Sequence, residues 1–199
     1  MDEQLVYIFA DESCLGNQFV EASRPGAAAG LIERFDERKG WQRRDFARFD
    51  ADTTNNRMAI VSGIEGLRAL KRSCSVVFTS DSQYLVRGMK DWVHGWAARG
   101  WRRKAGPIEN LELWKRLCRQ AAGHSVEWRW VRGHAGHPKN EYANDLAIRV
   151  ATERRGLDRT AESGFERWLE EQQDRNRYLD FLDIPDTRPF QPDRSPPRV

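Results

Sequence analysis

Long apolar runs and paired cysteines are both absent from this sequence. No run approaches the roughly 20 apolar residues that a membrane-spanning helix needs, which predicts no contact with a membrane. The first residues, 1–4, are acidic and polar, unlike a signal peptide. Cys14, Cys74 and Cys118 are widely spaced and include no Cys-x-x-Cys pair, which argues against a zinc site or a redox couple. We therefore expect a cytoplasmic protein with three reduced, structural thiols.

The chain has little net charge, +3 over 199 residues, but this charge is unevenly distributed. Between Arg87 and Lys104 there are six basic residues and one acidic residue, Asp91, together with three tryptophans. Such a segment suits a polyanionic partner, and a solvated basic face without a partner is the alternative. The length suits one domain of ordinary size with an appendage.

Hydrophobic periodicity predicts strands that alternate with helices. The expected strands cover residues 5–10, 27–35, 43–49, 75–79 and 126–131, and the expected helices cover 53–70, 82–90, 111–118 and 140–152. Short turns join the first three strands, which indicates an antiparallel meander. The later strands follow helical crossovers, which indicates parallel pairing. The predicted fold class is therefore α/β, with a mixed five-stranded sheet flanked by helices.

The composition changes near the C-terminus, which divides the chain into a domain at 1–155 and a charged extension at 156–199. Apolar residues from Phe165 to Leu182 could mark one amphipathic helix. Five of the eight prolines lie between Pro185 and Pro197, so this last segment should lack regular structure. We expect a helix packed on the domain, followed by a disordered tail.

Four motifs occur in a fixed order along the predicted domain. They are Asp11 with Ser13–Asn17, then Thr53–Met58, then Ser80–Tyr84, then Gly133–Pro138 with Asn140 and Glu141. In this order and spacing the chain resembles type 1 ribonuclease H from about Val6 to Ala151. The resemblance implies a ribonuclease H-like fold that cleaves the RNA strand of an RNA/DNA hybrid. It also implies two Mg²⁺ or Mn²⁺ ions held by four acidic residues.

Two of the family's four acids are replaced in this sequence. Carried over by position, Asp11 would bridge both metal ions and Asp81 would hold one. The family's helix-borne glutamate falls at Ala59, which has no ligating atom, and its final aspartate falls at Asn144, which still offers an amide oxygen. His134 matches the family's loop histidine, which is thought to help the attacking water or the product leave.

Three explanations for these departures remain open. A relocated acid is the first: Glu12, where the family usually has glycine, adjoins Asp11, although strand alternation argues against it. Glu65 lies about 120° around the helix from Ala59, and Asp145 about 100° from Asn144. The second explanation is a deliberate substitution that traps substrate. The third is a natural hybrid-binding protein that has lost cleavage.

Substrate recognition can be inferred separately from cleavage. The resemblance places Asn17, Asn55, Asn56 and Gln83 along the minor groove, where a protein senses 2′-hydroxyls, and Thr54 on a DNA phosphate. Helix capping is the alternative for Thr54 and Asn55. The basic segment resembles the family's protrusion that grips DNA, and its candidate contacts are Lys90, Trp92, Arg99, Trp101, Arg102, Arg103 and Lys104. The tryptophans could instead pack this segment onto its own helix.

The sequence thus predicts a monomeric ribonuclease H with a divalent-metal mechanism. One rival is a hybrid-binding module without catalysis. Another is a resolvase or a nuclease acting on DNA, which the asparagines suited to a hybrid disfavour.

Overall fold

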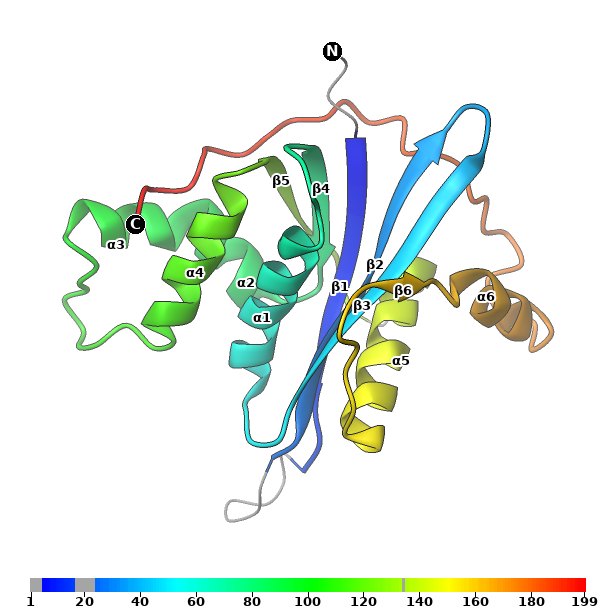
Figure 1. Ribbon diagram of the computed structural model, residues 1–199, viewed down its shortest axis with the longest axis horizontal. Coiled ribbons are helices and arrows are strands. Elements are labelled where there is room, and N and C mark those ends of the chain that lie inside the picture. The colour runs from blue at the N-terminus through cyan, green and yellow to red at the C-terminus, as the bar shows by residue number, and fades with distance from the viewer. Residues whose placement is uncertain (1–4, 17–23, 134) are drawn as a thin grey trace.

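The structure is a computed structural model that describes residues 5–16, 24–133 and 135–199. Two residues of interest, Asn17 and His134, lie outside the described residues. A single sheet with the strand order β5-β4-β1-β2-β3-β6 forms the centre, and helices cover both of its faces (Figure 1). No helix in these described ranges is both long enough and apolar enough to cross a bilayer.

The sheet is mixed, as the sequence predicts. Its first five strands are β1 (Leu5–Cys14), β2 (Gly26–Asp36), β3 (Gly40–Asp50), β4 (Ser75–Ser80) and β5 (Ser125–Trp130). Strands β1, β2 and β3 form the antiparallel meander, and β4 pairs in parallel with both β1 and β5. The prediction of five strands is wrong, because β6 (Ala161–Glu162) adds a sixth beside β3. Two residues are too few to show an alternating pattern in the sequence.

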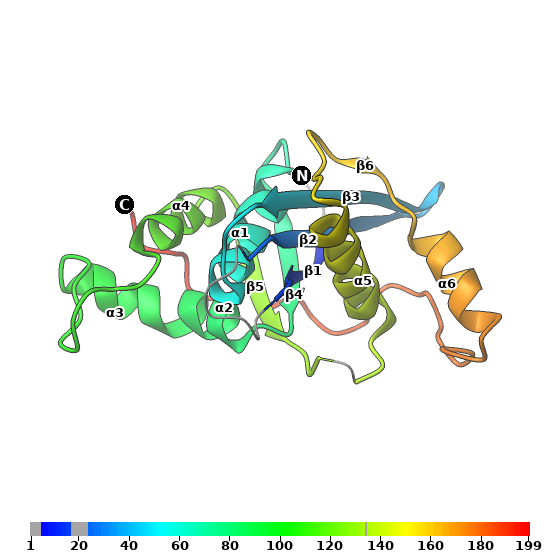
Figure 2. The same ribbon diagram turned by 90° about the horizontal axis from the view of Figure 1, so that it is seen from below.

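Alternation along β1 separates two apolar layers. Val6, Ile8 and Ala10 pack in a core with α1 (Asn55–Arg68) and α4 (Leu111–Ala121). Tyr7 and Phe9 face the opposite core, which is completed by α5 (Pro138–Glu153). Figure 2 shows α1 and α5 on the two sides of the sheet.

The helix expected at 82–90 is longer and irregular. It comprises α2 (Gln83–Arg87), a π-helical turn η1 (Gly88–Trp92) and α3 (Val93–Ala98). The wide turn begins at Gly88, where a Cβ atom would lie 2.1 Å from the ring of Trp114. Direct packing of this ring on the backbone accompanies the change in helix type, and periodicity alone could not reveal it.

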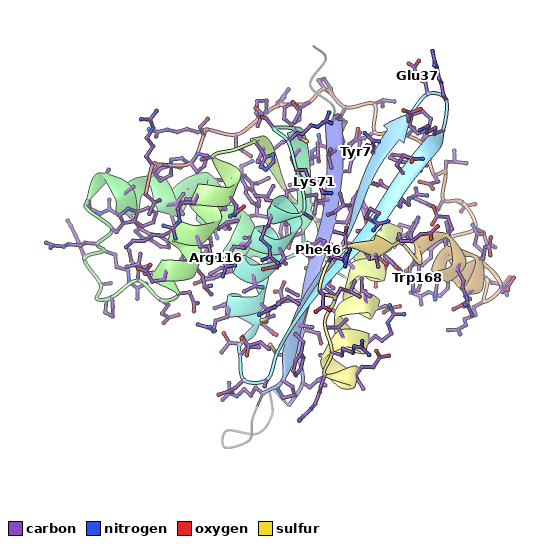
Figure 3. The ribbon with its side chains drawn as sticks, in the orientation of Figure 1. Tyr7, Glu37, Phe46, Lys71, Arg116 and Trp168 are labelled. Atoms are coloured by element: carbon purple, nitrogen blue, oxygen red, sulfur yellow. The ribbon has the colours of Figure 1, made fainter. Side chains whose placement is uncertain are left out.

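The C-terminal extension forms part of the same body. Helix α6 (Phe165–Gln173) packs Trp168 against Tyr142 of α5, and Figure 3 shows Trp168 on that helix. The predicted helix does not reach Leu179 or Leu182, because it ends at Gln173 and the following residues include backbone angles with positive φ.

Residues 174–199, which we call the strap, contain no helix or strand, but they are not the disordered tail that the sequence predicts. The strap returns from α6 across the sheet to the lobe containing α3 (Figure 1, orange to red). At the edge strand β5, the amide of Asp193 donates to the carbonyl of Val126 at 2.9 Å, and the amide of Trp128 donates to the Asp193 carboxylate at 2.8 Å. Prolines prevent regular structure, but an extended chain can still dock through its other amides and its carboxylates.

Candidate active site

The strand register brings Asp11 and Asp81 together. Strands β1 and β4 are parallel, and their last pair is Ala10 with Ser80. Asp11 and Asp81 are the next residues on the two strands, at the same end of the sheet. The central requirement of the sequence-based prediction, two carboxylates that meet, is therefore satisfied.

Asp11 is 6% exposed and lies in an acidic environment. Its Oδ1 accepts the amide of Glu12 at 2.7 Å, and its Oδ2 accepts Nδ2 of Asn140 at 3.4 Å. Burial, followed by the charge of Asp81, raises the pKa of Asp11 to about 8. A buried carboxylate with so little positive charge nearby is a strong candidate ligand for a cation.

Glu12 approaches the same place from the other face of the sheet. Alternation continues Val6, Ile8 and Ala10 to Glu12, so Glu12 lies on the face covered by α1. Burial and the charges of Asp11 and Asp81 raise the pKa of Glu12 well above its usual value. Its Oε2 is buried and has no hydrogen-bond partner among the residues that the structure describes.

The alternative acids do not reach this place. Ala59 is fully buried in the core between α1 and the sheet. Glu65 forms salt bridges with Arg68 and, at 3.9 Å, with Arg116 on α4. Asp145 accepts the indole N–H of Trp168 at 2.8 Å and therefore faces α6. Of the acids considered from the sequence, only Glu12 adjoins the aspartate pair.

Asn140, on the first turn of α5, is a site residue that the sequence-based assignment of roles missed. It is 3% exposed, and its Oδ1 has no hydrogen-bond partner in the described parts of the chain. Half-buried Asn144 lies one helical turn further along α5, so both amides follow one side of the helix. The spacing of four residues between two asparagines was the available signal.

Gly133 leaves the space that Asp81 occupies. A Cβ atom on Gly133 would lie 2.3 Å from Oδ2 of Asp81. On the other side, the indole N–H of Trp130 donates to the backbone carbonyl of Asp81 at 2.9 Å. The residues around the end of β5 thus determine where the Asp81 carboxylate lies.

This arrangement suits a hard divalent cation, because it offers carboxylate and amide oxygens. Within the described ranges, no group of three or more His, Cys, Asp or Glu side chains is arranged so that it could hold a metal ion. An open set is the usual one for Mg²⁺, which commonly takes one or two carboxylates and leaves its other positions for water and substrate phosphate. The residues present therefore fit a site that is completed by a phosphodiester.

Residues predicted to read the substrate lie at two exposed helix starts. Thr54 caps α1, its Oγ1 accepting the amide of Arg57 at 3.3 Å, so the capping role is confirmed. Asn55 and Asn56 follow on the exposed first turn, and Gln83 is exposed at the start of α2. Their side chains are accessible to a ligand that spans both helices.

The basic segment divides into exposed cations and packed aromatic rings. Arg99, Arg102, Arg103 and Lys104 are exposed beyond α3. The ring of Trp92 packs 5.6 Å from Tyr84, 5.9 Å from Trp96 and 6.5 Å from Trp114. Trp101 also packs against this core and has Lys115 6.0 Å from its ring. These contacts favour the structural alternative for the tryptophans.

Lys90, unlike the exposed cations beyond α3, contacts other parts of the protein. Its ammonium forms a 3.0 Å salt bridge with Asp193 of the strap. It also donates to the carbonyl of Trp128 at 3.3 Å. Lys90 therefore links the start of the protrusion to the C-terminal strap.

Comparisons with known proteins agree with this geometry. Residues 3–152 match the family model described as RNase H. Ribonuclease HI of Neisseria meningitidis serogroup A is 43% identical over 152 residues, which is 75% of this chain and 97% of that protein. Ribonuclease H of Aliivibrio salmonicida is 44% identical over 161 residues, covering 80% of this chain and 95% of that protein.

A solved structure extends the likeness over the whole chain. The crystal structure of LC9-RNase H1 is 44% identical, has a TM-score of 0.90 and covers 100% of this chain and 96% of its own. It is described as a type 1 RNase H with the type 2 active-site motif. The solution structure of the PFV RNase H domain, at 17% identity and a TM-score of 0.63, shares the fold alone.

The chain belongs to the ribonuclease H family. It is accordingly an endonuclease that cleaves the RNA strand of RNA/DNA hybrids, as enzymes of this family do with divalent metal ions.

Proposed function

We propose that this ribonuclease H uses Glu12 in place of the acid that the family carries on α1. Alternation along β1 places Glu12 on the face covered by α1, where Ala59 stands at the family's position without a carboxylate. Alternation, which counted against Glu12 in the sequence, supports it once the two faces of the sheet are known. A metal ion requires a ligand oxygen at the right position, and a glutamate on a strand can supply that oxygen as well as a glutamate on a helix.

The proposed ligands are Asp11, Asp81 and Glu12, with Asn144 as a neutral oxygen donor. Bound in a pair, Mg²⁺ or Mn²⁺ would activate the attacking water and stabilise the leaving oxygen. Burial, together with the charges of neighbouring carboxylates, raises the pKa of Asp11 and of Glu12. Repulsion between these carboxylates favours the binding of a cation, and cation binding would release the protons held by Asp11 and Glu12.

The description of LC9-RNase H1 supports a rearranged acid set. That protein combines a type 1 framework with a different active-site motif. The present chain departs from the type 1 pattern at Ala59 and Asn144 and is similar to LC9-RNase H1 throughout its length. We therefore propose a working enzyme rather than an inactive binding module.

We propose that the hybrid lies across the starts of α1 and α2. The short polar side chains of Asn55, Asn56 and Gln83 suit a wide, shallow minor groove. The cations beyond α3, Arg102 and Arg103 among them, suit the phosphates of the DNA strand. We assign to Asn17 the family's contact along the minor groove, and to His134 the family's role in helping the attacking water or the product leave.

The deciding experiment compares Glu12→Gln with Glu65→Gln, which removes a charge from α1 but not from the site. Labelled RNA/DNA hybrid, RNA duplex and DNA duplex are incubated with each protein in Mg²⁺ and then in Mn²⁺. Loss of one metal ligand should lower kcat on the hybrid by about 10²- to 10³-fold, about 3–4 kcal/mol in barrier height. Glu65→Gln should keep its activity within about 3-fold.

The outcomes separate the candidate functions. Full activity of Glu12→Gln would reject the relocated acid. Binding of hybrid by the unaltered chain without cleavage in either metal would identify a binding module. Preferential cleavage of the DNA duplex would favour a nuclease acting on DNA.

We also propose a monomer in the cytoplasm. Cys14, Cys74 and Cys118 form no disulfide within the described parts of the chain, which is typical of proteins in a reducing compartment. Size-exclusion chromatography with light scattering tests the monomer, and fractionation of the source cells tests the location.

A further inference from the structure

The strap reaches a charged cluster that lies beneath the sheet next to the start of α5. The cluster contains Glu33 of β2, Arg43 of β3 and Lys139 of α5, whose side chains are 1%, 5% and 7% exposed. Arg43 donates to Glu33 at 2.8 Å, and Lys139 also pairs with Glu33. These three buried groups together carry two positive charges and one negative charge.

Asp183 of the strap, whose side chain is 27% exposed, supplies a second negative charge, and Glu166 of α6 also pairs with Arg43, at 2.6 Å. The Asp183 carboxylate lies 2.5 Å from Arg43 and 3.1 Å from Lys139. Its backbone carbonyl accepts the indole N–H of Trp41 at 2.9 Å. A buried ion cluster that loses one partner is strongly destabilised, because the remaining charge stays dehydrated.

Aromatic rings restrict Lys139 further. Its ammonium lies 4.3 Å from the ring centre of Trp41, 5.5 Å from that of Phe9 and 5.9 Å from that of Phe181, which also belongs to the strap. Such cation–π contacts hold the side chain of Lys139 between the rings. The strap therefore contributes both a carboxylate and a ring to the binding of one lysine.

Lys139 is the immediate neighbour of Asn140, the residue that contacts Asp11. Both lie in the first turn of α5, where the amides of Asn140 and Glu141 donate to the carbonyl of His137 at 3.0 Å. A helix end is normally the part most prone to fraying, because its first amides lack partners in the helix. Holding Lys139 thus holds the turn that presents Asn140 to the acidic site.

We propose that Asp183 is a positioning residue for the active site. It acts through Lys139, and it couples the C-terminal strap to the contact between Asn140 and Asp11. The family model ends at residue 152, so the strap is a feature added to the matched domain. The inference uses the proposed site only through Asp11, and its main measurement does not require activity.

The test uses the full chain with Asp183→Asn, which keeps the side-chain size and removes the charge. Asp180→Asn is the matched control, because Asp180 is an exposed carboxylate of the same strap. Amide hydrogen exchange is measured over residues 138–142 without metal, at a temperature where both variants are folded. Steady-state cleavage of a labelled hybrid is then measured in Mg²⁺.

Asp183→Asn should exchange these amides about 10-fold faster than Asp180→Asn, because the first turn opens more readily. Its kcat should fall about 10-fold, with KM changed less than about 2-fold, because the reacting groups are displaced while the hybrid surface is intact. Asp183→Glu should recover part of both losses.

A lower Tm for Asp183→Asn, with exchange and kcat equal to those of the control, would overturn the proposal and leave a purely structural role. If Asp183→Asn does not fold, Trp41→Phe provides the milder change, since it removes the donor to the Asp183 carbonyl and keeps a ring near Lys139. Trp41→Phe should then show faster amide exchange over residues 138–142 and a lower kcat, both by smaller factors than expected for Asp183→Asn. Unchanged exchange in Trp41→Phe would reject the coupling. Absence of cleavage in the unaltered chain would affect the proposed function and not the exchange result.

Discussion

Replacing Gly133 with alanine should separate catalysis from folding in this protein. The added Cβ would lie 2.3 Å from Oδ2 of Asp81, 3.3 Å from its Cγ and 3.5 Å from its Cβ. Ordinary contacts between carbon and oxygen are about 1 Å longer than the first of these distances. The carboxylate must therefore rotate or move by about 1 Å.

The cost should appear in the reaction rather than in stability. Gly133 does not have a positive φ, so alanine introduces no backbone strain there, and a carboxylate end can rotate at low cost. A displacement of about 1 Å at a reacting group can cost about 10²-fold in rate, or about 2.7 kcal/mol. We expect kcat on the hybrid to fall by that factor while Tm changes by less than about 2 °C.

Gly123→Ala is the matched control, because a Cβ atom there meets only the carbonyl of Gln120 at an ordinary 3.5 Å. Hybrid cleavage and thermal unfolding are measured for both variants, and Mg²⁺ affinity is measured by calorimetry. The reasoning would be refuted by a Gly133→Ala protein with unaltered kcat and Mg²⁺ affinity, since Asp81 would then tolerate displacement.

Three further predictions concern charge. Because the folded protein raises the pKa of Asp11 to about 8, it binds a proton more tightly than the unfolded chain, and this group lowers stability as pH rises from about 4 to about 8. In EDTA, Asp11→Asn should therefore have a higher Tm than the unaltered protein at pH 8 but not at pH 4. Mg²⁺ should raise the Tm of the unaltered protein only. If the two proteins have the same Tm at pH 8 as well as at pH 4, the prediction is contradicted. Replacing Arg102 and Arg103 with neutral residues should raise KM for the hybrid. It should also reduce the slope of log affinity against log salt concentration by about 0.7–0.9 for each phosphate that is no longer neutralised. An unchanged slope would exclude a role for these two cations in phosphate binding. Deleting residues 175–199 should lower the free energy of unfolding in urea by about 3–5 kcal/mol, because it removes Asp183, one of the carboxylate partners of Arg43 and Lys139. A decrease below about 1 kcal/mol would show that the strap is dispensable.

Local patterns were sufficient to predict the central strands and the meeting of Asp11 with Asp81. Apolar alternation and helical crossovers determine which strands are parallel, and parallel strands bring the residues after their ends together. The outcome for Glu12 could not be derived in the same way. The role of Glu12 depends on which face of the sheet α1 covers. Local periodicity in a single sequence does not reveal which face of a strand a distant helix covers.

The extension shows a second limit of local patterns. Proline content correctly predicted a segment without helices or strands, but contacts with residues more than 100 positions away determine its place. Asp183 is one of ten acidic residues from position 155 onward, and nothing adjacent to it indicates a buried partner. Lys90 was assigned to DNA for the same reason, since its partner Asp193 is also distant in the sequence.

The extension pairs in part with β3, through β6, and with the outer strand β5, through the strap. An uncovered outer strand offers unpaired amides and carbonyls on which a second molecule can add its own strand, and growth of this kind leads to fibrils. Here the last quarter of the polypeptide takes some of those hydrogen-bonding positions, opposite Arg44 and Asp45 of β3 and at Val126 and Trp128 of β5. Shortened versions designed to match the smaller relatives should consequently become prone to precipitation at high concentration.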